Sequence, residues 1–498
     1  MNTFNPELLN DCEREPLAHS GLLQPHGAML FLSKQTGTFS FGSANLEQYI
    51  GESHEDLLGE DGREWLSEML PDLVDLPTSA GDRQYLVRAL DLGEGELNAL
   101  ISPTADGWII EFEFAGDDES SSELFNTSLP ALSSLQDMAT IQQAVVDGIA
   151  NITGYDRVML YQFLPDWSGE VLAESVQRSK GTYLSLRFPA SDIPAIARGL
   201  YAQAPYRYIP LSTNDTVDIM GLADAGSNLD LTWSDLRSVS PVHIQYLTNM
   251  QVFASFSVSI MVEGKLWGLI ASHNDAPGPI PLSGRLACTE LIANFVERVN
   301  EQRVIQQKII ADSISSQIGS ALSAGKSKEE LAKAIVGAVS QLQGQVDFSA
   351  CVIDVGGHTE CSDPSIDSAV SEALLELSQE TALDQLGTWE SLPEDMAARA
   401  ALWKAGIYGC GCFRLRAGAV GNALVTILLL RPEESGEVAW AGNPEKPVEL
   451  TQTGTVKLSP RESFEKWVQV RRGMSRVWNE DDRFTMGLMQ KQLSAALT

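Results

Sequence analysis

The residue best suited to covalent chemistry is Cys12, which occurs in Asp11-Cys12-Glu13-Arg14-Glu15-Pro16 ahead of Leu23-Gln24-Pro25-His26-Gly27. A thiol on an N-terminal segment can reach a pocket built by later residues and form a thioether with a conjugated ligand. Such a bond would be an attachment and not a catalytic step. Taken alone, Cys12 is more simply one free thiol among six, because reactivity needs a pocket and a neighbour that stabilises the thiolate.

A second cluster, Pro189-Ala190-Ser191-Asp192-Ile193-Pro194, offers a carboxylate at a bend. Pro194 biases Ile193 away from helical angles, so the carbonyl and carboxylate of Asp192 can face one ligand. That carboxylate suits the N–H groups of a cationic heterocycle or of an arginine. A helix N-cap from Ser191 or Asp192 would also explain the string, and the two roles can coexist.

Histidines and arginines complete the polar candidates. His243 and Tyr246 lie close together at the start of a predicted helix, and His273 ends a predicted strand. Imidazoles titrate near neutral pH and could relay protons, although a single histidine on an apolar face is usually a core residue. Arg207 and Arg237 could each clamp a ligand carboxylate, although surface arginines are commoner than clamps.

Predicted strands at Arg157–Phe163 and Ala254–Val262 would position these groups. In the second strand, Ser255 and Ser257 alternate with apolar residues. If this polar face lines a cavity, the two hydroxyls can donate to a ligand carboxylate. A serine row that faces solvent explains the alternation equally well.

The length of 498 residues suits about three domains of ~100–200 residues each. Short apolar runs and turn signals predict an α+β fold class, with domains at 1–120, 121–305 and 306–498. Apolar residues from Leu291 to Leu322 predict a helix of about thirty residues between the last two domains. Such a helix packs on its own domains or pairs with a second copy, and we favour a parallel homodimer. A last helix is expected at Asp481–Ala496.

The third domain contains a segment without core periodicity, at about 433–478. Val448-Glu449-Leu450 and Val456-Lys457-Leu458 flank a turn at Thr453-Gly454-Thr455, which predicts a hairpin extension. The segment is too long for an ordinary connection, so we expect it to be functional.

The composition argues against several classes of function. With 67 acidic and 34 basic side chains, the net charge is −33, which disfavours binding to nucleic acid or to anionic membranes. No apolar run approaches the ~20 residues of a membrane span, and the residues from Met1 to Asn5 lack a basic region followed by an apolar stretch, so a cytoplasmic location is expected. No Cys/His set has zinc-ligand spacing, and no motif for phosphotransfer or nucleotide chemistry occurs. We therefore predict no metal site and no catalytic residue.

Taken in order, these strings resemble the photosensory module of phytochromes, most closely that of the bacterial phytochromes. The resemblance covers essentially the whole chain as consecutive PAS, GAF and PHY domains. It implies antiparallel sheets flanked by helices, long connecting helices, and a hairpin tongue that extends from the third domain. The motifs that carry it are Cys-x-x-Glu-Pro with Gln-Pro-His-Gly, Pro-Ala-Ser-Asp-Ile-Pro, Ser-Pro-x-His with Tyr-Leu-x-Asn-Met, and Pro-Arg-x-Ser-Phe.

By resemblance, the chain is a red/far-red photoreceptor that binds a linear tetrapyrrole. Plant and cyanobacterial members carry their attachment cysteine directly after the histidine of Ser-Pro-x-His, where this chain has Ile244. The resemblance therefore implies biliverdin IXα on a thioether to Cys12. Asp192 would bond the pyrrole N–H groups through its carbonyl, and His243 would hold the associated water. The other implied contacts are Arg207, Arg237, Ser255 and Ser257 at the propionates, His273 at the terminal ring carbonyl, Tyr161, Phe188, Tyr201 and Tyr246 around ring D, and Ile193 and Pro194 beside Asp192.

The resemblance also implies a switch in the tongue. Arg461 would reach Asp192 in the dark-adapted form, and Ser463 would replace it after the tongue refolds to helix. Isomerisation of the ligand would thus bias two packings of one segment. The implied switch residues are Trp440, Pro460, Arg461, Ser463 and Phe464.

The chain departs from the family pattern at three places. It has Leu17-Ala18-His19-Ser20-Gly21 where the family has Ile-His-x-Pro-Gly, Ala441 at the first glycine of Trp-Gly-Gly, and Gln469 at the acidic residue of Trp-x-Glu. We expect the path past the ligand and the energetics of the tongue to differ accordingly.

Two other classes of function stay open. The chain could be the photosensory part of a histidine kinase or diguanylate cyclase whose catalytic domain is absent, acting on a C-terminal output domain or a response regulator. It could also be a PAS/GAF ligand sensor without photochemistry. Cys12, Asp192, His243 and Arg461 together argue against the latter, and a lack of visible absorbance with biliverdin would favour it.

Overall fold

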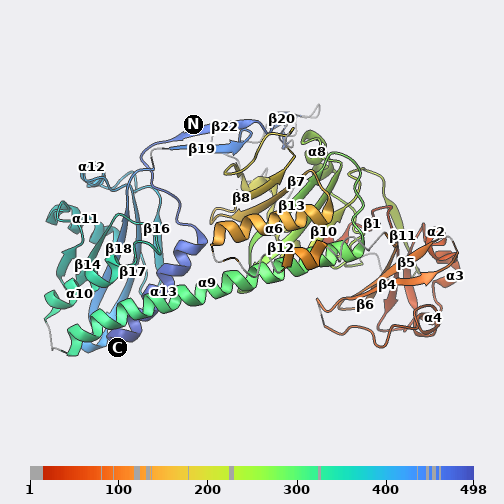
Figure 1. Ribbon diagram of the computed structural model, residues 1–498, viewed down its shortest axis with the longest axis horizontal. Coiled ribbons are helices and arrows are strands. Elements are labelled where there is room, and N and C mark those ends of the chain that lie inside the picture. The colour runs from red at the N-terminus through yellow and green to blue at the C-terminus, as the bar shows by residue number, and fades with distance from the viewer. Residues whose placement is uncertain are drawn as a thin grey trace. The chain divides into compact units, whose positions relative to one another are not determined.

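The computed structural model describes residues 15–79, 81–93, 95–116, 124–129, 135, 137–177, 179–223, 229–323, 327–434, 436–444, 448–450, 456–458, 461 and 463–498 (Figure 1). Three features of the sequence analysis lie outside these residues. They are Cys12, Pro460 and the turn at Thr453-Gly454-Thr455.

The N-terminal sheet has the strand order β1-β11-β3-β2-β6-β5-β4 and is antiparallel. Its strands are β1 (Leu22–Leu23), β2 (Ala28–Ser33), β3 (Phe39–Ser43), β4 (Gln84–Asp91), β5 (Glu96–Pro103), β6 (Gly107–Phe114) and β11 (Val217–Gly221). Short helices α2 (Glu47–Ile50), α3 (His54–Leu57) and α4 (Gly62–Met69) pack beside it.

One strand of this sheet comes from the second domain, which the sequence pattern did not indicate. β11 pairs with β3 on one side, with Ile219 opposite Ser43, and with β1 on the other. It covers the free backbone edge of β3, which would otherwise leave peptide groups unpaired. The first two domains are therefore joined through a shared sheet.

The sheet of the second domain has the order β10-β12-β13-β7-β8-β9 and is antiparallel. Its strands are β7 (Arg157–Phe163), β8 (Gly169–Val176), β9 (Arg187–Phe188), β10 (Tyr206–Ile209), β12 (Ala254–Val262) and β13 (Lys265–Asn274). Its helices are α6 (Met138–Thr153), α7 (Ala195–Tyr201) and α8 (Pro241–Asn249). The predicted strands at 157–163 and 254–262 have the expected bounds.

The third domain has an antiparallel sheet of order β15-β14-β18-β17-β16. The strands are β14 (Ala350–Val355), β15 (His358–Cys361), β16 (Leu386–Trp389), β17 (Gly409–Ala417) and β18 (Ala423–Arg431), and the helices are α10 (Lys328–Ser340), α11 (Ser368–Ser378), α12 (Arg399–Lys404) and α13 (Glu480–Leu497). The last helix was expected at 481–496 and extends one residue further at each end.

The long helix α9 spans Leu282–Ser323, 42 residues, and is longer than the thirty expected from Leu291. It begins directly after Pro281, which can precede a helix but cannot continue one. Gly319 does not end it, because one glycine costs only about 1 kcal/mol in a helix and Ile314 and Ile318 are fully buried. In the described part of the chain, no helix is both long and apolar enough to cross a membrane.

The described residues of the tongue form two strand pairs. β20 (Val448–Leu450) and β21 (Val456–Leu458) pair antiparallel with Val448 opposite Leu458, which confirms the predicted hairpin strands. Nearer its base, β19 (Gly436–Ala441) lies beside β22 (Lys466–Arg471), and Trp440 pairs in parallel with Arg187 of β9. This second pair, which the sequence did not indicate, continues the sheet of the second domain.

Candidate chromophore site

One face of the second sheet gathers five of the predicted site residues. Ser257 lies opposite Arg207, Ser255 lies opposite His273, and Tyr161 lies opposite a residue of β13. Residues directly opposite each other in an antiparallel sheet point to the same side. Ser255 and Ser257 are buried, with 5% and 8% exposure, so the solvent-facing reading of the serine row is wrong.

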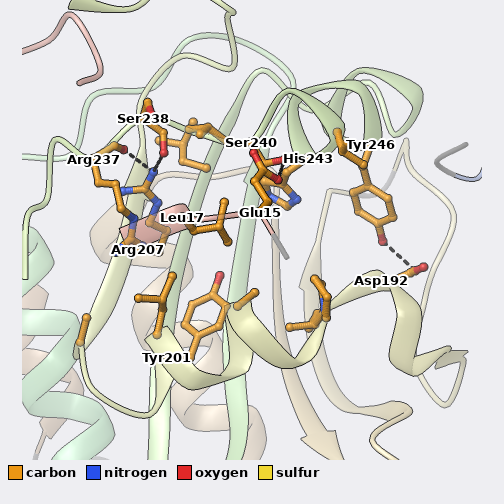
Figure 2. A pocket seen from close by; sticks show the side chains of 18 of the residues that line it. Glu15, Leu17, Asp192, Tyr201, Arg207, Arg237, Ser238, Ser240, His243 and Tyr246 are labelled. Carbon is orange, nitrogen blue, oxygen red and sulfur yellow. Dashed lines mark hydrogen bonds between the residues drawn. The ribbon is translucent and has the colours of Figure 1, made fainter. Parts of the chain in front are cut away.

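A cavity of about 1090 Å³, open mouth included, lies beside this sheet (Figure 2). Of the predicted set, eight residues line the cavity, namely Asp192, Ile193, Pro194, Tyr201, Arg207, Arg237, His243 and Tyr246. Tyr161, Phe188, Ser255, Ser257 and His273 are not among its lining residues and belong to the sheet behind it.

Several lining residues were not anticipated. Glu15 and Leu17 line the cavity from the N-terminal segment, and Ser238 and Ser240 line it from the loop before α8. The Ser240 hydroxyl donates to Glu15 Oε2 at 2.7 Å. The sequence did contain a signal for Glu15. It belongs to the Glu-Pro of the first motif and follows Cys12, the predicted attachment residue, by three residues.

Two guanidinium groups face the cavity, from the buried Arg237 and the half-buried Arg207. Arg207 Nη2 donates to the carbonyls of Arg237 and Ser238, the latter at 3.0 Å, as Figure 2 shows. Arg237 Nη1 donates to two carbonyls of its own loop at 3.3 Å each. Burial, followed by repulsion from Arg237, lowers the pKa of Arg207 to about 9. Within the described residues neither arginine has a carboxylate at salt-bridge distance, so both suit an anionic ligand.

The two candidate histidines are neutral at pH 7. Burial and then Arg207 lower the pKa of His243 to about 4, and its ring stacks on Tyr246 with centroids 5.9 Å apart. Burial, then Arg157, lower the pKa of His273 to about 3. His273 Nδ1 and the Tyr161 hydroxyl are buried without a hydrogen-bond partner among the described residues. Buried polar groups of this kind usually bond to a ligand or to water.

Asp192 lies at the bend that the sequence predicted. Ile193 has φ −123° and ψ 87°, and Pro194 caps α7 without a side-chain hydrogen bond, so the N-cap alternative for Asp192 is wrong. The carboxylate instead accepts from the Tyr246 hydroxyl at 3.1 Å and from Arg461 Nε at 3.3 Å. A second guanidinium nitrogen, Nη2, completes a two-point ion pair.

The tongue covers this ion pair. The Arg461 side chain is 2% exposed, its Nη1 donates to the Ala441 carbonyl, and its own carbonyl accepts from Asn249 at 3.0 Å. Phe464 is buried and meets the Tyr246 ring edge-on at 5.1 Å. Ser463, in contrast, is exposed to solvent.

Aromatic rings fill the space between the sheet and the tongue. Tyr161 meets Phe163 at 5.3 Å and Phe188 at 6.1 Å between centroids, both edge-on. Gly169 leaves room for this packing, because a Cβ there would lie 1.8 Å from the Tyr161 ring. Together with Ala441 and Phe464 these residues form one apolar cluster, with Tyr201 and Tyr246 at its border.

Comparison with known sequences identifies three domain families in the chain. The PAS fold matches residues 12–115, the GAF domain matches 137–299, and the Phytochrome region matches 315–498. The bacteriophytochrome of Pseudomonas aeruginosa is 31% identical over 495 residues, which cover 97% of this chain and 66% of the relative. Cyanobacterial phytochrome B of Nostoc sp. is 31% identical over 500 residues, with 95% and 64% covered. The chain thus spans just under two thirds of the length of each of these relatives.

Solved structures agree with this assignment along the whole chain. The phytochrome photosensory core module of Stigmatella aurantiaca has a TM-score of 0.80 at 28% identity, covering 97% of both chains. A bacteriophytochrome from the photosynthetic bacterium R. palustris has a TM-score of 0.74 at 25% identity, covering 98% of this chain and 99% of that one. Family membership implies a bilin chromophore for the cavity described above. The chain therefore belongs to the phytochrome family, as a PAS–GAF–PHY photosensory module of the bacteriophytochrome type.

Proposed function

We propose that this module binds biliverdin IXα covalently through Cys12 and converts reversibly between two forms, Pr and Pfr, by isomerisation of ring D. Refolding of the tongue then passes the signal to a C-terminal output domain. The observation that carries the proposal is the buried ion pair between Asp192 and Arg461, set at the wall of a cavity that Arg207 and Arg237 also line.

The other cysteines are poor candidates for the attachment. Cys288, Cys351, Cys410 and Cys412 are buried, and Cys361 is partly buried. Burial raises the pKa of every one of these thiols, that of Cys361 to about 11, and the nucleophile is the thiolate. Glu15 lines the cavity, and Cys12 precedes it in the sequence by three residues, a chain length of about 10 Å at most, which is compatible with the proposed attachment.

The residues present fit a linear tetrapyrrole with two propionates. Arg207 and Arg237 would bind the propionates, supported by Ser255 and Ser257 on the same sheet face. The Asp192 carbonyl would accept from the pyrrole N–H groups. His273 and Tyr161 have polar atoms that find no partner among the described residues, and they suit the carbonyl of ring D. The chromophore supplies the photochemistry, and the protein supplies position and charge.

Asp192 gives the switch its two states. Here it accepts from Arg461, which corresponds to the dark-adapted arrangement, while Ser463 faces solvent. If isomerisation of ring D displaces the aromatic cluster under the tongue, the ion pair is lost and Ser463 can take the place of Arg461. A segment with two packings that differ by a few kcal/mol can be biased in this way.

The chain spans 66% of the length of the Pseudomonas aeruginosa relative, and we propose that the output domain corresponds to the part of that relative that it does not span. We propose a histidine kinase or diguanylate cyclase as the output, a response regulator as a partner, a homodimer through α9, and a cytoplasmic location. We also propose that the PAS, GAF and PHY domains span residues 1–120, 121–305 and 306–498, with the tongue at about 433–478.

Reconstitution with biliverdin tests the function. We expect a red absorbance band that falls under red light, with a gain further to the red that far-red light reverses. Binding without photoconversion would contradict the photoreceptor and leave a bilin-binding protein.

The attachment is tested separately with Cys12→Ser. This variant should still bind biliverdin but should lose zinc-induced fluorescence of the denatured band. Cys288→Ser is the matched control and should retain that fluorescence. A fluorescent Cys12→Ser band would overturn the attachment at Cys12.

A further inference from the structure

A buried ionic cluster lies between the first two domains, outside the cavity. It contains Arg83, which precedes β4, and Glu111 of β6, together with Asp235 from the loop before α8. Arg83 Nη2 donates to Asp235 Oδ1 at 2.8 Å and lies 3.9 Å from Glu111 Oε2. The side chains of Arg83, Glu111 and Asp235 are 2%, 2% and 5% exposed.

This cluster holds one loop from the side of the first domain. Glu111 accepts from the Ser234 hydroxyl at 2.6 Å and from the main-chain N–H groups of Asp235 and Leu236 at 3.1 and 3.0 Å. The Asp235 side chain also accepts from the Tyr206 hydroxyl. The loop at 234–238 is therefore fixed at its side chains and at its N–H groups.

Three carbonyls of the same loop are directed at Arg207, which lines the cavity. Those of Asp235, Arg237 and Ser238 all accept from the guanidinium of Arg207. Arg207 lines the cavity, whereas Arg83 and Glu111 do not. A continuous path thus runs from Arg83 through Asp235 and its loop to Arg207, and Figure 2 shows the last step.

Stability alone does not explain such a cluster. Burying several charges carries a desolvation penalty, and well-packed apolar residues often serve a fold as well or better. What the charges add is geometric precision, because a binding constellation must be held to within about 0.5 Å by the residues behind it.

We infer that Arg83 of the first domain is a positioning residue for the chromophore site: through Asp235 it holds the carbonyls that aim Arg207 at a carboxylate of the ligand. This inference rests on the proposed binding of a bilin whose propionate meets Arg207. It assigns the first domain a direct part in ligand affinity, although Arg83 does not line the cavity.

The test compares biliverdin with its dimethyl ester, in which both propionate groups are esterified and carry no charge. Binding is measured by absorbance titration in the Cys12→Ser chain, where it is reversible. Arg83→Met should raise the dissociation constant for biliverdin by about fivefold to tenfold and leave that for the ester within about twofold. Arg83→Lys, which retains the charge, should recover part of the loss.

Arg88→Met is the matched control, because Arg88 is also paired in the first domain but its pair with Glu96 is exposed. It should change neither constant. If Arg83→Met does not fold, Asp235→Asn carries the same test, because it removes the charge and preserves the shape.

In a parent chain that binds biliverdin, equal losses for both ligands would show a merely structural role and overturn the inference, as would no loss for either. A parent chain that binds no biliverdin would overturn the proposed function and this inference with it.

Discussion

At the scale of single residues, Asp192 is the point on which the site depends. Its carboxylate accepts from Arg461 of the tongue and from Tyr246 of α8, and its loop lines the cavity. A buried carboxylate that loses its cationic partner is strongly destabilised unless another donor replaces it. In the proposed mechanism, a movement of ring D would therefore act on the tongue through Asp192.

Arg461→Ala and Ser463→Ala should shift the switch in opposite directions. Arg461 stabilises the hairpin form, so its loss should slow the thermal return from the photoactivated form by about tenfold or more. Ser463 is expected to stabilise the photoactivated form, so Ser463→Ala should speed that return. Dark-reversion kinetics after red light measure both effects, and each variant should still bind biliverdin. Unchanged reversion in Arg461→Ala would argue against the tongue switch.

The neutral histidines predict a dependence of stability on pH in the ligand-free chain. In the unfolded chain His243 takes up a proton below pH 6.5, while the folded chain holds its pKa at about 4. Folding stability should therefore fall as the pH drops from 6.5 to 4. Since the ring borders an open cavity, we expect about 1 kcal/mol between pH 7 and pH 5.

Urea unfolding at pH 7 and pH 5 measures this effect. His243→Gln should reduce the difference between the two pH values, whereas His358→Gln, at an exposed position of β15, should leave it unchanged. An identical pH dependence in the parent chain and in both variants would show that His243 is not the source of the pH-dependent stability.

At the scale of elements, the hairpin form of the tongue has one position, Gly442, where only glycine fits. Gly442 has φ +82°, and a Cβ there would lie 2.0 Å from the Ser463 carbonyl oxygen. Ala441, where the family has glycine, is fully buried without a left-handed backbone, and its carbonyl accepts from Arg461. In this chain the second position of Trp-Gly-Gly therefore needs glycine, and the first does not.

Gly442→Ala should destabilise the hairpin form of the tongue by about 1–3 kcal/mol because of backbone strain and the close contact. Faster amide hydrogen exchange at residues 439–442 in the dark-adapted protein is the expected result. Gly344→Ala is the control, because a Cβ at Gly344 would meet nothing within 4 Å. Equal exchange rates in Gly442→Ala and the parent chain would contradict this account of the tongue.

At the scale of the whole molecule, α9 carries an exposed apolar group beyond its buried stripe. Val304, Ile305 and Ile309 are 51%, 50% and 43% exposed, whereas Ile310 and Ile314 on the same helix are fully buried. Ile305 and Ile309 are four residues apart and lie on one face of the helix. These residues are the candidate contact for the proposed homodimer.

Ile305→Glu and Ile309→Glu should each weaken the dimer by about tenfold or more, since a buried isoleucine contributes about 1.5–3 kcal/mol. Sedimentation equilibrium across a range of protein concentrations measures this change. Gln307→Glu adds one charge to an exposed position of the same helix, on another face, and should leave the dimer intact. A monomeric parent chain, or dimers of equal strength in all variants, would overturn the proposed contact.

The amino-acid sequence by itself determined the local features of this protein. The strands at 157–163 and 254–262, the bend at Ile193 and the hairpin strands β20 and β21 follow from alternation, from proline and from β-branched residues, all of which act on the chain locally. The motifs also pointed to the family, because they keep their order along the chain.

Tertiary structure alone decided what depends on pairing between distant segments. The insertion of β11 beside β3, the parallel pairing of Trp440 with Arg187, and the path from Arg83 to Arg207 leave no periodic trace, since each partner is an ordinary residue in its own segment. The burial of Ser255 and Ser257, which excludes a row that faces water, was likewise decided only by the elements packed over their sheet. Alternation along a strand reports that its two faces differ, and only the fold determines what covers each face.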